Sequence, residues 1–344
     1  SQRGVRKKYY ALLTGNLEKE NISLEVIGLS NSQKMMLKDE SIDLQSASTV
    51  YEKSESLEQS DTNKMIKHMI AKPASSRIII DCSASDEIPD QYENIFENEI
   101  NIVTANKKGL SGSFERYHSI MKAKESNGIN FLYETTAGAA LPFIKSVSDI
   151  SSSSDEVRKI EGIFSGTLAY LFNTYDSSIP FSELVNEALQ QGFTEPDPRD
   201  DLSGMDVARK LVILAREMGL DMEVRDINVE SLVDPDHLKL SVDEYLKAMS
   251  SQDDALKNRY IKANESNQKL AYVAQLDENG KGSVSLNNLS SDHPFFSLKG
   301  TENIIAIYSN YYSDYPLVLR GPGAGREVTA SGLFFDLMSI SRMQ

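Results

Sequence analysis

The chain has 344 residues, of which 40% are hydrophobic and 25% charged, and its formal net charge is −15. This composition is typical of a globular protein long enough for two domains. The acidic excess argues against a nucleic-acid partner, because a phosphate backbone is bound by a basic face. No apolar run reaches the roughly 18 residues of a membrane span, and the first residues lack the pattern of a signal peptide.

Cysteine and histidine are rare in the chain. The single cysteine, Cys82, cannot form an internal disulfide, which favours a cytoplasmic location. The histidines are scattered without the spacing of metal ligands, so a zinc or iron site is not expected. They are His68, His118, His237 and His293.

The first part of the chain alternates strand and helix patterns. Strands are predicted at 22–30, 76–85, 101–108 and 129–142, helices at 8–16, 61–72, 88–98 and 114–128, and a loop-rich polar segment at 33–60. Strands that alternate with helices of this length are typical of a doubly wound parallel sheet.

The pattern changes after a predicted helix at 142–150 and a serine run at 151–154. Strands are predicted at 156–166, 302–310 and 315–321, helices at 181–192, 207–219 and 328–343, and a β-hairpin at 269–289 around Asn279-Gly280. These elements predict an α+β architecture for the second part.

Residues 194–210, TEPDPRDDLSGMDVARK, place five acids around two prolines. The prolines predict a stiff loop at 195–200, and Ser203 is a plausible N-cap for the next helix. Asp206 and Lys210 are spaced i, i+4 on one helix face. The run is either a solvated, acidic helix start with a surface ion pair, or a rigid set of carboxylates that binds an ammonium group beside a proton-transferring lysine.

Two loops follow predicted parallel strands, where open α/β sheets bind ligands. VTANKKG (103–109) offers Asn106 and Lys107 to a substrate or cofactor, and DCSAS (81–85) has small residues that allow a ring or a phosphate to come close. An ordinary polar loop after a strand, without a ligand, would have the same kind of sequence.

Two glycine-containing loops are also candidates. YETTAGAALP (133–142) exposes backbone carbonyls beside Glu134 and could coordinate a hard cation, although a packed turn would have the same sequence. GPGAGREVTASG (321–332) precedes a helix, so its N–H groups could face an anion.

These segments together resemble homoserine dehydrogenase, in the form found as the C-terminal part of bifunctional aspartokinase/homoserine dehydrogenase. The matching stretches are VTANKKG, YETTAGAALP, EGIFSGTLAYLFN, GFTEPDPRDDLSGMDVARKLVILARE and YSNYYSDYPLVLRGPGAGREVTASG, spread from about residue 76 to the C-terminus. The resemblance implies a reversible, NAD(P)-dependent interconversion of L-homoserine and L-aspartate 4-semialdehyde, on the route to threonine and methionine.

The resemblance also implies roles for individual residues. Lys210 would be the acid/base at the substrate oxygen, and Lys107 would lie beside the reacting centre and the nicotinamide. The substrate would be bound at Glu195, Asp206, Asp201, Thr167 and Gly192, the cofactor at Ser83, Ala84, Lys107, Gly325 and Gly4, and a structural monovalent cation, commonly sodium, at Glu134, Ala137, Ala139 and Leu141. Ala140 replaces a family glycine in this cation loop, and it would be strained if the position required a positive φ.

The implied fold is a Rossmann-like parallel sheet with an α+β domain for substrate binding and dimerisation. The nucleotide-binding domain would span 1–143 and be completed by 321–344, and the substrate domain would span 144–320. The family implies a homodimer, or a higher homo-oligomer, in which strands of two subunits pair. An aspartokinase domain could precede the chain, and no regulatory domain is expected after the last helix.

The main departure from the family is at the N-terminus. The family opens with a strand and a glycine-rich loop, whereas Arg3 and Arg6 stand here where glycines are expected and only Gly4 remains. We favour a fragmentary or faulty sequence start. The alternative is a truncated or diverged homologue with impaired cofactor binding, which acts as a domain of a larger aspartokinase polypeptide. A metal-dependent hydrolase is disfavoured because no histidine accompanies the carboxylates.

The stretch Gly28-Leu29-Ser30-Asn31-Ser32 bears on cofactor preference. An acid at the end of this strand would bind the ribose 2′-OH and favour NAD. None is present and Lys34 is close by, so we expect NADP to be preferred and NAD to remain possible.

Overall fold

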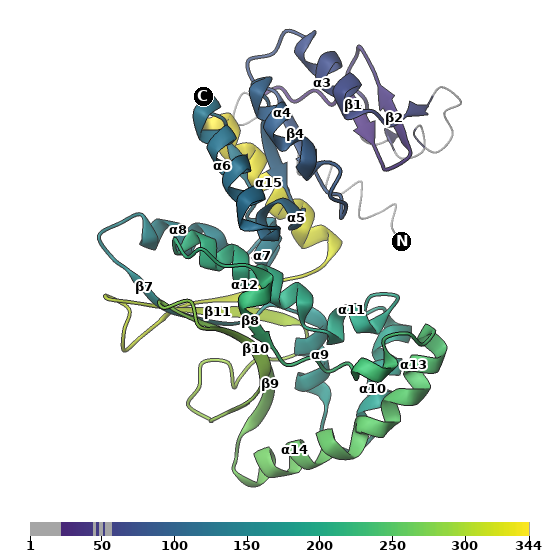
Figure 1. Cartoon of the computed structure of the whole chain (residues 1–344), viewed down its shortest axis with the longest axis vertical. Helices are drawn as coiled ribbons and strands as arrows, with labels where there is room; N and C mark the ends of the chain where they lie inside the picture. Colours follow the sequence, from purple (N-terminus) through teal and green to yellow (C-terminus); the bar gives the residue numbers. More distant parts are fainter. Residues whose placement is uncertain (1–21, 44–45, 48–50, 52–56, 344) are drawn as a thin grey trace.

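The computed structural model describes residues 22–43, 46–47, 51 and 57–343 (Figure 1). Gly4 and the predicted helix at 8–16 lie outside these residues. The described part contains a small antiparallel sheet in the order β1-β2-β3, a parallel sheet in the order β4-β5-β6, and a mixed sheet in the order β12-β11-β7-β9-β10-β8.

The parallel sheet confirms the alternation predicted for 76–142, whereas the strand predicted at 22–30 lies in the separate antiparallel sheet. The parallel sheet consists of β4 (Ile78–Asp81), β5 (Asn101–Thr104) and β6 (Phe131–Leu132), with the helices α4 (Tyr92–Glu97), α5 (Lys108–Ser111) and α6 (Phe114–Asn127) between the strands. Gly128 ends α6 at a φ of 64°, as its position in the sequence predicted. Asp81 pairs with Thr104 in register, so the loops after β4 and β5 leave from the same edge.

The predicted loop-rich segment at 33–60 is partly wrong. It contains β2 (Lys34–Leu37), which pairs with β1 (Gly28–Ser30), and β3 (Glu58–Gln59), which pairs with β2. The predicted strand at 22–30 shortens to β1. Met35 and Met36 of β2 are buried. That burial depends on packing by other segments, so the local sequence does not reveal it. The next helix, α3 (Thr62–Ile70), is confirmed.

The predicted strand at 129–142 is also shorter than expected. After β6 the chain turns into α7 (Thr135–Gly138), because the Thr136 hydroxyl and N–H both donate to the carbonyl of Tyr133. The positive φ of this loop, 53°, falls on Ala139 and not on Ala140, so the strain expected at Ala140 is absent.

The mixed sheet is built from β7 (Val157–Ile163), β8 (Ile227–Val229), β9 (Lys269–Asp277), β10 (Gly282–Leu289), β11 (Glu302–Ser309) and β12 (Leu317–Pro322). The hairpin β9–β10 confirms the turn at Asn279-Gly280, where Gly280 has a φ of 77°. The helices α8 (Phe143–Ser151) and α12 (Met205–Glu217) pack on one face of the sheet (Figure 1). Their apolar side chains form the main core with Ile160, Ile305 and Ile307.

The remaining helices flank this sheet or return to the parallel one. α9 (Gly166–Thr174), α10 (Phe181–Gln191), α11 (Pro198–Leu202), α13 (Val242–Ala248) and α14 (Asp253–Glu265) follow β7 or precede β9. α15 (Arg326–Arg342), drawn in yellow in Figure 1, packs against β5 and α7. None of the described helices is both long and apolar enough to cross a membrane.

Candidate active site

The acidic run 194–210 is not the simple loop that its prolines predicted. Its middle forms α11, which begins at Pro198 with Asp197 as N-cap, and its end belongs to α12. The prediction that Ser203 caps the following helix is wrong, because Ser203 still belongs to the end of α11. The N-cap of α12 is Gly204, whose φ is 73°.

Gly204 is required at this junction for two reasons. Its left-handed backbone is unfavourable for other residues, and a Cβ there would lie only 2.3 Å from the hydroxyl of Tyr272. That hydroxyl donates to the carbonyl of Glu230 at 2.6 Å. The tight turn between α11 and α12 places Asp206 in the first turn of α12.

Asp206 stands between two lysines. Its Oδ2 lies 2.9 Å from Nζ of Lys210, one turn further along α12, and its Oδ1 lies 3.2 Å from Nζ of Lys107. The first contact confirms the i, i+4 pair predicted from spacing. The second joins α12 to the loop after β5, a contact that spacing could not predict.

The three charged groups shift one another's pKa. Burial alone would raise the pKa of Asp206, but the ammonium groups of Lys210 and Lys107 outweigh burial and hold that pKa well below its usual range. Burial lowers the pKa of Lys107, and Asp206 opposes this effect. The carboxylate is therefore ionised near neutral pH.

The carbonyl of Phe164 is a further part of the cluster, and no sequence pattern indicates it. It lies just beyond β7 and accepts a hydrogen bond of 2.8 Å from Nζ of Lys210. The Lys210 side chain is only 12% exposed. Asp206 and this carbonyl thus hold its ammonium group from two sides.

The acids of the run divide into two groups. Asp197 binds the guanidinium of Arg199, and this pair holds α11 in place. The same guanidinium also donates to the carbonyls of His237, Leu238 and Leu240. Asp201 instead accepts the N–H of Glu195 at 2.8 Å and shapes the loop that presents the exposed Glu195. Burial raises the pKa of Asp201, and repulsion by the carboxylates of Glu195 and Asp206 adds to the rise.

Thr167 and Gly192 lie next to this loop. The Thr167 hydroxyl, on the first turn of α9, donates to the carbonyl of Phe193 at 2.8 Å. Gly192 ends α10 at a φ of 76°, as predicted, and starts the chain toward Glu195. The structure therefore brings Thr167, Gly192, Glu195 and Asp201 together at one loop, and it places Asp206 beside the two lysines.

The loops after β4 and β5 are tied by a buried polar network. Asn106 donates to Asp81 at 3.1 Å and to the hydroxyl of Ser83 at 3.0 Å, and Tyr92 donates to Asp81 at 2.7 Å. Asn106 is 2% exposed and is held by this network, and its contact with a ligand stays a prediction. Asn106 positions Ser83, while Ala84 remains exposed beside it.

Comparison with known proteins shows to which family the chain belongs. Residues 142–338 match the family model of homoserine dehydrogenase, and residues 9–134 match that of the homoserine dehydrogenase NAD-binding domain. The chain belongs to the homoserine dehydrogenase family. The second of these models describes the NAD-binding domain of that family of NAD(P)-dependent oxidoreductases.

Individual relatives agree with the family models. The chain is 41% identical to bifunctional aspartokinase/homoserine dehydrogenase 1, chloroplastic, of Zea mays over 94% of its own length and 35% of that protein. A crystal structure of a Candida auris protein of unknown function matches with 34% identity and a TM-score of 0.86, covering 93% of this chain and 91% of that one. A putative homoserine dehydrogenase from Archaeoglobus fulgidus shares the fold, with 24% identity, a TM-score of 0.77 and coverage of 98% and 95%. The chain spans about a third of the length of the curated relatives it matches.

The glycine-rich loop before α15 fits the cofactor segment expected of this family. Gly325 has a φ of 109°, and no atom lies within 4 Å of where its Cβ would be. Among the described residues no side chain caps α15 at Gly325, and a helix start of this kind favours an anion. Gly323 lies against Asn303, where a Cβ would come within 2.1 Å of the Asn303 amide. The residues after β4 and those before α15 are therefore compatible with a bound dinucleotide.

Backbone hydrogen bonds order the turn that was expected to hold a cation. Glu134 accepts the N–H groups of Ile144 and Lys145 at 2.8 and 2.9 Å, which caps α8. The carbonyl of Leu141 accepts the N–H of Phe143 at 2.8 Å. Ala137 and Ala139 are buried in the same turn.

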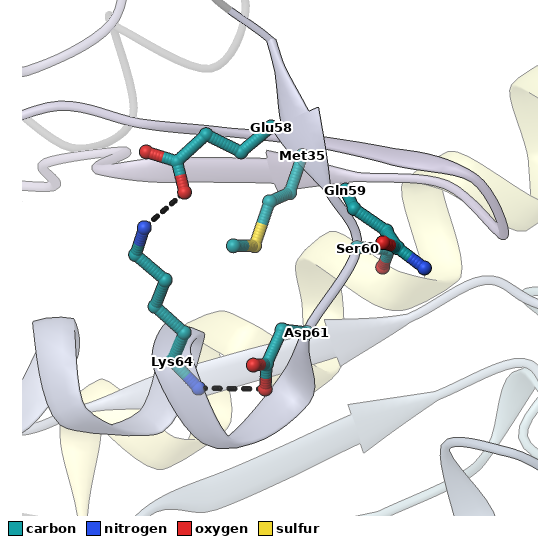
Figure 2. A pocket seen from close by; sticks show the side chains of 6 residues that line it. All are labelled: Met35, Glu58, Gln59, Ser60, Asp61 and Lys64. Atoms are coloured by element: carbon teal, nitrogen blue, oxygen red, sulfur yellow. Dashed lines mark hydrogen bonds and ion pairs between the residues drawn. The ribbon is translucent and has the colours of Figure 1, made fainter.

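An open hollow of about 420 Å³ lies on the small antiparallel sheet and α3 (Figure 2). The ion pair of Lys64 and Glu58 closes one side of it, and Met35 points into it. Ser60 on its wall bonds the hydroxyl of Ser30 at 2.8 Å. The hollow shares no residue with the Lys107–Asp206–Lys210 cluster.

Proposed function

We propose that this chain catalyses the reversible NAD(P)-dependent interconversion of L-homoserine and L-aspartate 4-semialdehyde. The observation that carries the proposal is the cluster in which Asp206 holds Lys107 and Lys210 at the edge of the parallel sheet. Family membership supplies the reaction, and the cluster supplies charged groups suited to an oxygen that gains and loses a proton.

Lys210 is the acid/base in this proposal. Its ammonium group donates a proton to the carbonyl oxygen of the semialdehyde during reduction, and the neutral amine removes the hydroxyl proton of homoserine in the reverse direction. Asp206 and the carbonyl of Phe164 orient that ammonium group. Lys107 stabilises negative charge on the same oxygen. The nicotinamide cofactor, when bound, supplies or accepts the hydride.

The substrate's amino group is assigned to the acidic loop. Glu195 is exposed and presented by Asp201, so its carboxylate is free to pair with an ammonium group. Thr167 and Gly192 lie at the start of the loop that carries Glu195, and we include both among the substrate-binding residues.

We assign the cofactor to Ser83, Ala84, Lys107 and Gly325, with Gly4 outside the described residues. The absence of an acid in 28–32 supports a preference for NADP. Initial rates with NADPH and NADH give the preference ratio, and strict dependence on NADH would contradict this assignment.

A monovalent cation, most simply sodium, is proposed at Glu134, Ala137, Ala139 and Leu141. The turn gathers one carboxylate and several carbonyl oxygens, which are ligands suited to a hard cation. A carboxylate that accepts two N–H groups keeps further lone pairs. Replacing sodium by choline should lower thermal stability in the native chain and leave Glu134→Gln unaffected.

We further propose the domain division 1–143 with 321–344 and 144–320, a homodimer formed through the second domain, and a cytoplasmic location. The gap between the two family matches supports the boundary near residue 143. The packing of α15 on β5 supports the return of 321–344 to the first domain, although the second match runs on to residue 338. The bifunctional relatives support a fused aspartokinase domain.

The test is an assay of reduced-cofactor absorbance with L-aspartate 4-semialdehyde and, in reverse, with L-homoserine. Lys210→Ala should lower kcat by about 10³-fold or more and leave the fold and cofactor binding intact. Lys262→Ala, which alters an exposed lysine on α14, is the matched control. Near-normal turnover of Lys210→Ala would refute the role of Lys210. No NADPH binding at millimolar concentration would favour a catalytically silent homologue.

A further inference from the structure

Arg216 is a buried cation in α12 that makes no ion pair with a described carboxylate. It is 6% exposed. Its guanidinium donates to the carbonyls of Leu110 and Gly112, the latter at 2.8 Å, and to the carbonyl of Met222 at 3.0 Å. It also lies over the ring of Tyr117, 4.6 Å from the centroid. Because arginine keeps its charge and a buried charge is costly, these contacts must offset its desolvation.

Two of these carbonyls belong to the turn that begins at Lys107. Lys107 is the N-cap of α5, and its own carbonyl accepts the N–H groups of Leu110 and Ser111 at 3.0 and 2.8 Å. α5 has only four residues, too few to be stable as a helix by itself. Arg216 therefore attaches the far end of this turn to α12.

α12 also carries Asp206 and Lys210. We propose that Arg216 is a positioning residue for the reaction, which sets the place of Lys107 relative to the Asp206–Lys210 pair. The inference rests on the proposed function, because it needs Lys107 to act on the substrate. A single helix thus controls all three charged groups, two by its own residues and one through Arg216.

Loss of Arg216 leaves another contact between the segment that follows α12 and the segment that follows α5. The carboxylate of Glu223 accepts the N–H of Phe114 at 2.9 Å, at the start of α6. The Arg216 side chain takes no part in this hydrogen bond, so we expect Arg216→Met to keep it and to fold. Arg259 offers a matched control far from Lys107, since it donates to the carbonyl of Leu286 and pairs with Glu230.

The experiment compares Arg216→Met, Arg216→Lys, Arg259→Met, Lys107→Ala and the double variant Arg216→Met/Lys107→Ala in the full chain, below the melting temperature of each. Arg216→Met should lower kcat by about 10²-fold with little change in the KM of the cofactor, and Arg216→Lys should recover part of the loss. Arg259→Met should keep the native kcat. The double variant should be no slower than Lys107→Ala, because Arg216 acts through Lys107.

A second readout is the rate of reductive methylation of individual lysines, followed by mass spectrometry. Lys107 should react faster in Arg216→Met, and Lys210 should not. The inference about Arg216 would be overturned, without affecting the proposed function, if the kcat losses of the two single variants multiplied in the double variant. It would also be overturned if the kcat of Arg216→Met stayed within about twofold of native. Normal turnover of Lys107→Ala would instead refute the proposed role of Lys107.

Discussion

Nζ of Lys107 and Oδ1 of Asp206 lie 3.2 Å apart, although Lys107 follows a strand of the parallel sheet and Asp206 begins a helix on the mixed sheet. The same carboxylate lies 2.9 Å from Lys210. One acid thus orders two ammonium groups that come from different parts of the chain, and removing its charge should affect both.

Asp206→Asn should move the alkaline limit of activity to lower pH. Burial lowers the pKa of Lys107 and the charge of Asp206 opposes this effect, so a neutral amide lets that pKa fall further. Lys107 would then lose its proton at a lower pH, and kcat would decline earlier as pH rises. The kcat–pH profile of the residual activity measures the shift. Asp200→Asn, at an exposed acid in the same run, should leave the profile unchanged; an unshifted limit in Asp206→Asn would contradict the coupling.

Asp201→Ala should weaken substrate binding more than cofactor binding. Asp201 accepts the N–H of Glu195 at 2.8 Å and so presents the carboxylate of Glu195. We expect the KM for homoserine to rise about tenfold, the loss expected for one charge-assisted hydrogen bond, with the KM for the cofactor unchanged. Asp201→Asn keeps an oxygen acceptor and should lose less. Equal effects of the two variants on both KM values would argue against this role.

Gly204→Ala and Gly219→Ala form a matched pair for stability. Both glycines have a positive φ, 73° and 78°, but only Gly204 lacks room for a Cβ, which would clash with Tyr272. Gly219→Ala should cost about 1 kcal/mol from backbone strain alone. Gly204→Ala should cost about 3 kcal/mol, because Tyr272 must also give up its hydrogen bond to the carbonyl of Glu230. Urea unfolding of both variants measures the difference, and similar costs would show that Tyr272 moves freely.

Glu161→Gln should flatten the acid dependence of stability. Burial alone would raise the pKa of Glu161. The His293 imidazole at 3.8 Å, the Lys159 ammonium group at 2.8 Å and the hydrogen bond from the Gln275 amide at 2.7 Å outweigh burial and lower that pKa to about 2 from the usual 4.5. The folded state therefore binds fewer protons than the unfolded chain between these values. The contribution to stability is complete above about pH 5 and is lost as pH falls through 2.

The measurement is the free energy of urea unfolding between about pH 7 and pH 2. Glu161→Gln should be less stable than the native chain at neutral pH, and the two should converge in acid. Glu187→Gln, at an exposed position of α10, should keep the native dependence. Parallel curves for Glu161→Gln and the native chain would rule out this contribution.

Features set by neighbouring residues were predictable from the sequence. Gly128 and Gly192 end their helices because a left-handed residue after a helix favours glycine, and the pair Asp206–Lys210 follows from helix periodicity. The cap of α12 was misassigned because Ser203 and Gly204 are both common at such positions, and only the turn geometry selects Gly204.

Features set by distant contacts were not predictable. The burial of β2 depends on pairing with β1 and β3, and its short sequence carries no clear period. The approach of Lys107 to Asp206, and of the Phe164 carbonyl to Lys210, depends on how α12 packs between the two sheets. Resemblance to the family indicated the two lysines and Asp206. It did not indicate the carbonyl of Phe164 or the hydrogen bonds from Arg216 to the carbonyls of Leu110 and Gly112.

The position of α15 has a consequence for the order of assembly. This helix packs against β5 and α7, and its Asp336 accepts the N–H of Glu134 at 3.1 Å. On the ribosome, every strand of the mixed sheet is made before α15 emerges, so that sheet can form while the earlier parallel strands still lack their neighbour. A nonsense codon just before Arg326 would leave every strand of the mixed sheet in the product. It would nevertheless remove the helix that packs against β5, which is synthesised before any strand of the mixed sheet.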